Sequence, residues 1–141
     1  MANLDKVLED FLCSSYSKLI HNEERILKVL GDITLKELRT LEVIKTCENR
    51  DNNTSSTVAR LLGISAGTLT TNIDRLSKKG LVVRTKKEGD LRTNLLALTL
   101  KGEKVLKSYN DEHRKLITNG LSKLTSTEKA TIVSLVSKLE I

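Results

Sequence analysis

Residues 58–90, VARLLGISAGTLTTNIDRLSKKGLVVRTKKEGD, begin with two short amphipathic segments and end in a basic run. The first segment, residues 55–62, stops at Gly63, a residue suited to the left-handed conformation that ends many helices. Ser65 is a favourable N-cap for a second helix that ends near Gly80. Its predicted buried face consists of Leu69, Ile73 and Leu76. Two short helices joined by a tight turn predict a helix-turn-helix.

A β-hairpin is predicted directly after this helix pair. Residues 81–86 and 93–100 have strand-like composition, and the loop KEGDLR, residues 87–92, separates them. A hairpin in this position predicts a wing beside the second helix. Arg92, near the turn, suits a narrow minor groove, where negative potential is concentrated. We expect the Asp90 carboxylate either to accept hydrogen bonds from backbone N–H groups of the turn or to pair with a nearby arginine.

Further helices are predicted on both sides of this region. Residues 4–30 form a long apolar stripe that ends at Gly31, and a capping box at Thr34 starts a helix that reaches about residue 47. After the hairpin, one helix is predicted to run to residue 119 with Gly120 beyond its end, and a last helix starts at Thr125. The expected fold class is mainly α with a small β-hairpin wing: a winged helix-turn-helix with N- and C-terminal dimerisation helices.

Charge is distributed unevenly along the 141 residues. The formal net charge is +6, but residues 75–107 hold ten basic and three acidic residues, a net +7, so the rest of the chain carries −1. A concentrated basic segment predicts a polyanionic partner. Because the chain has only three aromatic residues, recognition of single strands by base stacking is disfavoured. Double-stranded DNA is therefore the expected partner.

The predicted DNA contacts come from three places. The face of the second helix opposite its apolar residues carries short polar side chains that fit the major groove, which is about 12 Å wide. The start of the first helix and the basic residues of the wing are expected to contact phosphates. The predicted DNA-binding residues are Ser55, Ser56, Ser65, Gly67, Thr68, Thr70, Thr71, Asn72, Arg75, Lys78, Lys86, Lys87, Asp90 and Arg92.

The segment STVARLLGISAGTLTTNIDRLSKKGLVVRTKKEGDLRTNLLALTLKGEKVL, residues 56–106, resembles the core of the MarR family of bacterial transcription regulators. The resemblance rests on Ala59-x-x-Leu62 before the turn, TLTTNIDRLSKKGLVVR in the second helix and first strand, and LTLKG at the start of the next helix. In the wing, the family's usual acid-arginine-arginine tripeptide is Asp90-Leu91-Arg92 here. One phosphate contact of the family is therefore expected to be missing.

This resemblance implies a homodimer whose first and last two helices intertwine. A two-fold dimer would bind a pseudopalindromic operator as a repressor, with recognition helices about 34–36 Å apart. The expected organisation is one domain, residues 1–141, in which 1–31 and 101–141 dimerise and 32–100 form the DNA-binding lobe. Long amphipathic helices at both ends agree, because one small lobe cannot cover so much apolar surface.

Three kinds of signal are open for a regulator of this type. EERILKVLGDITLKELRTLEVI (23–44) and GTLTTNIDRLSKKG (67–80) resemble the branch that represses fatty-acid-synthesis genes, which implies a small apolar ligand or acyl-acyl carrier protein as effector. Cys13 is a candidate for oxidation, although no basic residue lies within a helix turn of it to lower its pKa. His21 and His113, joined by glutamates, are candidates for a metal site, although their spacing shows no converging set.

Other protein classes are less well supported. A winged helix can serve as a protein-interaction module that does not bind DNA, but the +7 segment argues against this alternative. The sequence contains no nucleophile elbow, phosphate loop or histidine-rich metal motif, so neither an enzyme nor a cofactor is expected. No apolar run is long enough to cross a membrane and the N-terminus has no secretory signal, which predicts a cytoplasmic protein with reduced cysteines.

Overall fold

The computed structural model describes residues 3–139, which form six helices and one two-stranded antiparallel sheet. The elements are α1 (Leu4–Leu30), α2 (Leu35–Asn49), α3 (Ser55–Leu62), α4 (Ala66–Lys78), β1 (Val82–Lys87), β2 (Asp90–Leu98), α5 (Leu100–Leu121) and α6 (Ser126–Val136). The predicted fold class, mainly helical with a hairpin wing after a helix-turn-helix, is confirmed.

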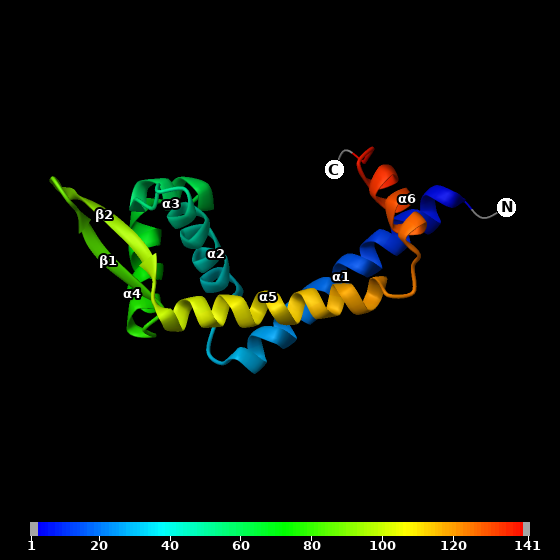
Figure 1. Ribbon diagram of the computed structural model, residues 1–141, viewed down its shortest axis with the longest axis horizontal. Helices are drawn as coiled ribbons and strands as arrows, with labels where there is room; N and C mark the ends of the chain where they lie inside the picture. Colours follow the sequence, from blue (N-terminus) through cyan, green and yellow to red (C-terminus); the bar gives the residue numbers. More distant parts are fainter. Residues whose placement is uncertain (1–2, 140–141) are drawn as a thin grey trace.

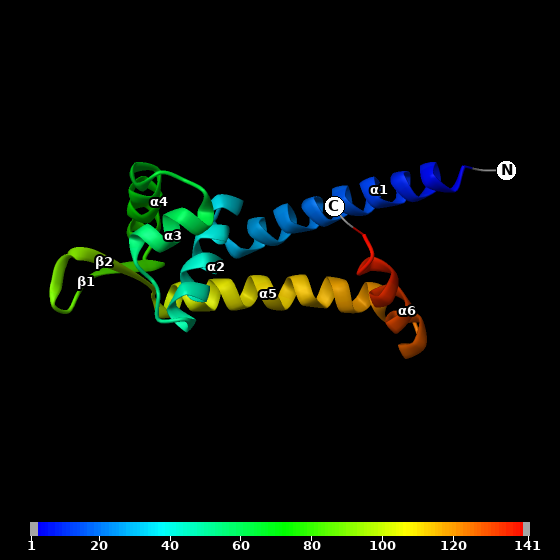
Figure 2. The same ribbon diagram turned by 90° about the horizontal axis from the view of Figure 1, so that it is seen from above.

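The molecule is elongated and has a lobe at one end (Figure 1). Helices α2, α3 and α4 make this lobe, and the β1–β2 hairpin projects from it away from the rest of the chain. Helices α1 and α5 are in contact and both extend from the lobe toward the opposite end; they cross in the view of Figure 1 and diverge toward the far end in Figure 2. Helix α6 lies at that far end, beside the end of α5 (Figure 2).

The hydrophobic core lies in the lobe and at its junction with α1 and α5. Its most buried side chains come from α2, α3, α4 and the base of the wing: Leu38, Leu41, Ile44, Val58, Ile73, Leu76, Leu81 and Leu96. Helix α1 contributes only Ile26 and Leu27 to the buried set, although it has 27 residues. Helix α6 contributes none. The apolar stripes at the far end are therefore not covered within one subunit.

Local sequence signals fix the predicted helix starts. Thr34 and Glu37 form the capping box of α2, and Thr125 starts α6 with the same motif. The Ser65 hydroxyl accepts the Thr68 N–H at the start of α4. Gly63 ends α3 at φ 67°, a left-handed conformation that costs other residues steric strain, so the chain turns sharply into α4.

Three predicted boundaries are wrong. The hairpin loop expected over residues 87–92 is only the turn at Glu88 and Gly89, because the strands continue to Lys87 and resume at Asp90. Gly120 lies inside α5, which ends at Leu121. A single glycine costs a helix about 1 kcal/mol, which does not suffice to end one. Helix α2 extends to Asn49, two residues beyond the predicted end.

A close backbone contact joins the base of the wing to α5. The Thr99 N–H donates to the Leu81 carbonyl at 3.0 Å, and the Thr99 hydroxyl donates to the Gly80 carbonyl at 2.6 Å. Gly102, in the first turn of α5, lies so near the Leu81 carbonyl that a Cβ at this position would overlap it. The glycine therefore allows α5 to start directly against the first strand.

Candidate nucleic-acid interface

Helix α4 buries one face and exposes the other. Leu69, Ile73 and Leu76 are buried, as predicted. On the opposite side, Gly67 faces open space, so a Cβ there would meet no atom of this chain. The remaining predicted contact residues of α4 are also at the surface: Thr68, Thr70, Thr71, Arg75 and Lys78 are exposed and Asn72 is half-buried. The face has the short side chains that close approach to base edges requires.

Hydroxyl groups on this face already donate their protons within the helix. Thr70 donates to the Ala66 carbonyl at 3.0 Å, and Thr71 donates to the Gly67 carbonyl at 3.2 Å. In this rotamer their oxygens remain acceptors, which can bind the amino groups of adenine or cytosine but not phosphate. The Ser65 hydroxyl donates to Thr68 Oγ1 at 2.9 Å, so the hydroxyl proton of this N-cap residue is also used within the helix.

A hollow of about 520 Å³ lies between α3, α4 and the wing. Four of the predicted contact residues line it: Ser55, Ser56, Thr70 and Lys86. Ser55 and Ser56 form the first turn of α3, where backbone N–H groups favour anions. Lys86 Nζ donates to Asn94 Oδ1 at 2.7 Å, across the strand pair. The structure therefore brings the start of α3, the middle of α4 and one wing lysine to one concavity.

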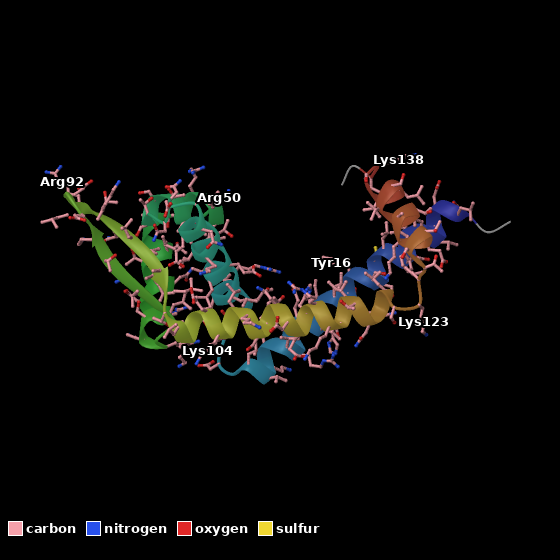
Figure 3. All side chains as sticks on the ribbon, viewed as in Figure 1. Tyr16, Arg50, Arg92, Lys104, Lys123 and Lys138 are labelled. Carbon is pink, nitrogen blue, oxygen red and sulfur yellow. The ribbon has the colours of Figure 1, made fainter. Side chains whose placement is uncertain are left out.

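Arg92 lies at the tip of the wing, farthest from the two long helices (Figure 3). Lys86 pairs with Asn94 and Lys87 with Asp90, so three residues of β2, Leu91 to Thr93, have no counterpart on β1. Asp90 shapes this bulge: its Oδ1 accepts the Arg92 N–H at 3.0 Å and its Oδ2 accepts the Thr93 hydroxyl at 2.8 Å. These two hydrogen bonds lower the pKa of Asp90. Of the two expected roles, capping of the backbone is confirmed, and the carboxylate does not pair with an arginine.

The basic residues of the segment fall into paired and unpaired groups. Lys79 binds Glu37 at 2.8 Å, Lys107 binds Asp111 at 2.7 Å, and Arg84 pairs with Asp74. Among residues 3–139, by contrast, no carboxylate forms an ion pair with Arg75, Lys78, Lys87 or Arg92. Lys86, Lys101 and Lys104 form no ion pair in this part of the chain either; Lys86 donates to Asn94 and Lys101 donates to the Lys79 carbonyl. The cations without a carboxylate partner therefore lie on α4, on the wing and in the first two turns of α5, where they can meet an external anion.

Sequence reasoning missed the ion pair between Arg84 and Asp74. Arg84 had counted only toward the basic total, and Asp74 had no assigned role. A signal was present, because alternation along a strand places Arg84 on the same face as buried Val82, toward the lobe. Asp74 is also the one acidic residue of α4. An acid on a helix that is expected to meet DNA requires a neutralising partner.

A polar network joins α1, α2 and α5 where the long helices leave the lobe. Glu23 Oε1 accepts hydrogen bonds from the Tyr109 hydroxyl at 2.9 Å and from Arg39 at 2.8 Å. Arg39 also binds Glu42 at 2.8 Å, and the Tyr109 ring stacks on His113 with centroids 5.7 Å apart. Burial, followed by the hydrogen bond to Glu23, raises the pKa of Tyr109 to about 12. This network fixes the position of the lobe relative to the α1–α5 pair.

The candidate sensor residues are not assembled into a site within one subunit. Cys13 is exposed on α1, whereas Cys47 is buried in the lobe, and burial raises the pKa of its thiol. His21 is exposed, and the imidazole ring of His113 stacks on the ring of Tyr109. No group of three or more potential metal ligands occurs among residues 3–139. In the same part of the chain, no helix has the length and apolar character needed to cross a membrane.

Comparisons with known proteins agree with this architecture. The sequence profile of the MarR family matches residues 33–93. The transcriptional repressor MprA of Escherichia coli is 30% identical over 125 residues, which cover 87% of this chain and 69% of MprA. YdgJ of Bacillus subtilis, described as an uncharacterized HTH-type transcriptional regulator, is 23% identical over 94% of this chain and 83% of its own length.

Two solved structures of similar fold contain DNA. A mutant of S. aureus MepR bound to an oligodeoxyribonucleotide has a TM-score of 0.77 and 21% identity, and covers 94% of this chain and 98% of that one. Streptococcus pneumoniae FabT in complex with DNA has a TM-score of 0.71 and 24% identity, and covers 96% of this chain and 93% of that one. The coverage extends the similarity of fold to the terminal helices.

Proposed function

Because this chain belongs to the MarR family of DNA-binding transcription regulators, a non-enzymatic family, we propose that it is a homodimeric repressor of a pseudopalindromic operator. Each subunit places α4 in a major groove and the wing tip in the adjacent minor groove. The alternative of a winged-helix module that binds only proteins is disfavoured by membership of this family. Residues 32–100 act as the DNA-binding lobe, and 1–31 and 101–141 act in dimerisation. A regulator of this kind works in the cytoplasm.

The observation that carries this proposal is the group of cations on α4 and the wing that have no ion-pair partner. Arg75 and Lys78 lie on α4, and Lys87 and Arg92 lie on the wing. Elsewhere in the basic segment, Lys79 and Lys107 bind carboxylates of the same chain, whereas Lys101 and Lys104 at the start of α5 have no such partner among residues 3–139. Unpaired cations that share one functional unit indicate an external polyanion. The short side chains of α4 then read base edges.

The proposed contacts divide by chemistry. Thr70 and Thr71 face bases, because their hydroxyl protons are used within the helix. Thr68, Asn72 and Arg75 face bases or the flanking phosphates, and Ser65 and Gly67 lie where the start of the helix approaches the DNA closely. Ser55, Ser56, Lys78, Lys86 and Lys87 bind phosphates. Arg92 enters the minor groove, and Asp90 shapes the bulge that presents it.

Support for the dimer comes from the apolar surface at the far end of the subunit. On α1, Leu4 is 79% exposed and Phe11 is 64% exposed. On α6, Val133 is 67% exposed and no side chain is buried. Large exposed apolar patches are rare on monomeric proteins. A second copy of the chain covers these stripes and sets the two α4 helices one DNA turn apart.

The test is selection of duplexes from a random-sequence pool by the purified protein, followed by sedimentation of the protein alone and with a selected duplex. We expect a two-fold related consensus with half-sites about one helical turn apart, and two subunits per duplex. Binding should weaken steeply as salt rises. A monomeric protein that retains no duplex at low salt would refute the proposal.

For the effector, we propose an acyl group, as in the branch that represses fatty-acid-synthesis genes. FabT is among the structures of similar fold, and its 24% identity supports the fold alone. A hollow of about 540 Å³ at the α1–α2 corner has an apolar part formed by Ile20, Leu27, Ile33 and Leu35, and charged residues, Glu24, Lys28 and Asp32, also line it. The apolar part suits an acyl chain. If acyl-acyl carrier protein leaves the affinity for the selected duplex unchanged, this effector is wrong.

Oxidation of Cys13 remains the second candidate signal, because its side chain is exposed in the subunit. A Cys13→Ser variant should then keep DNA binding in the presence of peroxide, while the wild type loses it. Equal responses of the two proteins exclude this thiol. Metal sensing through His21 and His113 has less support, since His113 stacks on Tyr109.

A further inference from the structure

The Arg84–Asp74 pair is the polar link between the wing and α4. One guanidinium nitrogen of Arg84, Nη2, pairs with Asp74 Oδ1 and also donates to the Thr70 carbonyl at 3.3 Å. Thr70 and Asp74 are one helix turn apart, so Arg84 binds two points on the same side of α4. Among residues 3–139, no other hydrogen bond or ion pair joins β1 or β2 to α4.

The wing has other polar attachments, but they lie at its base and on β2. The Leu96 N–H donates to the Asn53 carbonyl at 2.9 Å, and the Asn53 amide donates to the Leu96 carbonyl at 2.7 Å. Beyond these bonds the hairpin projects from the lobe as two strands (Figure 1). A two-stranded hairpin is marginally stable by itself in water, so its direction depends on such side contacts. Arg84 supplies the contact on the β1 side.

The position of this pair links two parts of the interface. Arg84 and Thr70 both line the hollow between α3, α4 and the wing, so the arginine bridges the hollow from β1 to α4. The same contact neutralises Asp74, whose carboxylate would otherwise repel DNA phosphates from the recognition helix. Both side chains are partly exposed, at 38% for Arg84 and 51% for Asp74. Exposed pairs of this kind contribute little to folding, so a role in stability is not the explanation.

We propose that Arg84 and Asp74 are positioning residues, which hold the wing at the distance from α4 that lets both enter adjacent grooves at once. Arg84 therefore does not bind phosphate, although it lies in the basic segment. This inference rests on the proposed function, in which α4 and the wing bind the same duplex. It adds that the distance between them is set by a pair of residues within the subunit.

Whether Asp74→Ala weakens or strengthens binding to DNA distinguishes a positioning role of Arg84 from a direct phosphate contact. If Arg84 positions the wing, Arg84→Ala and Asp74→Ala both weaken binding to the selected duplex, each by about tenfold for the two pairs of a dimer. If Arg84 binds phosphate, removal of the nearby acid strengthens binding instead. Asp111→Ala is the matched control, because it breaks the exposed pair with Lys107 on α5 and is expected to leave affinity unchanged.

Two further readouts depend on the mechanism. The double variant Arg84→Ala, Asp74→Ala leaves no uncompensated charge, so positioning predicts an unchanged slope of log affinity against log salt for it, whereas loss of a phosphate contact from both subunits lowers the slope by about 1.8. Arg84→Ala should also cost less affinity in an Arg92→Ala background, because the contact of Arg92, one part of the wing contact, is already lost. Because one nitrogen of Arg84 makes both contacts, Arg84→Lys keeps a charged donor that can replace it and should bind DNA more tightly than Arg84→Ala.

Thermal melts of every variant establish that it is folded, and fluorescence anisotropy with the selected duplex gives the affinities. Tighter binding by Asp74→Ala, a lower salt slope for the double variant, or wild-type affinity for both single variants overturns the inference. Failure of the proposed function has a different signature, since the Arg92→Ala variant would then also bind as the wild type does. In that case the positioning role is refuted with it.

Discussion

Replacement of Lys87 by glutamine should reduce the salt dependence of operator binding by a calculable amount. Lys87 is the last residue of β1, is exposed, and has no ion-pair partner among residues 3–139. It is therefore proposed to bind a phosphate directly. Glutamine keeps most of the side-chain length and removes the charge, so the variant loses one counterion-releasing contact in each subunit.

The magnitude follows from the number of contacts. Each phosphate neutralised contributes about 0.9 to the slope of log affinity against log salt, so two contacts per dimer contribute about 1.8. When salt rises fourfold, from about 50 to about 200 mM, the ratio of wild-type affinity to variant affinity should fall roughly 12-fold. The difference between the proteins is thus largest at low salt.

Anisotropy titrations of a labelled duplex at four salt concentrations measure both slopes. Lys123→Gln is the control, since it makes the same change of charge near the end of α5 remote from the wing (Figure 3). We expect its slope to equal that of the wild type. An unchanged slope for Lys87→Gln, or an equal decrease for both variants, would show that the wing lysine does not meet a phosphate.

Three further substitutions test separate parts of the structure. Gly102→Ala should lower the free energy of unfolding by about 1–3 kcal/mol in chemical denaturation, because its Cβ would overlap the Leu81 carbonyl; wild-type stability would contradict the close contact. Tyr109→Phe should cost about 1 kcal/mol by loss of the hydrogen bond to Glu23. In the folded protein the pKa of Tyr109 is raised from 10.0 to about 12, so the stability that its hydroxyl adds is complete below pH 10 and declines toward pH 12. The difference in melting temperature between wild type and Tyr109→Phe should therefore shrink over this range. A constant difference would argue against the hydrogen bond. Asp90→Ala should weaken operator binding about as much as Arg92→Ala and leave the melting temperature unchanged, whereas wild-type affinity would mean that the bulge does not present Arg92.

The features that could be predicted from sequence are those set by neighbouring residues. The capping box of Thr34 and Glu37 and the N-cap of Ser65 act over three residues, and both are present as expected. The buried face of α4 follows from helical spacing alone. The extra strand residues at Asp90 and the continuation of α5 through Gly120 were missed, because turn-forming residues favour but do not require an end.

The features that could not be predicted join residues far apart in the chain. Tyr109 and Glu23 are separated by 86 positions, and no pattern in either segment indicates that they meet. Arg84 and Asp74 are closer in sequence, yet their pairing depends on how the hairpin folds back on α4. The predicted DNA-contact residues of α4 and the wing lie at the surface, and their contacts with DNA stay a prediction. The sequence did not distinguish arginines with partners from those without.

Because α6 has no buried side chain within one subunit, we expect the melting temperature of the protein to depend on its concentration. If a second chain supplies the missing cover, dilution separates the subunits and leaves each with an exposed, weakly held C-terminal helix. Mass action then links folding to abundance: a tenfold rise in protein adds about 1.4 kcal/mol to the stability of the associated form. In a cell that contains few copies, a larger fraction of the protein would be dissociated subunits, which proteases degrade first. We therefore expect synthesis rate and survival time of this protein to rise together.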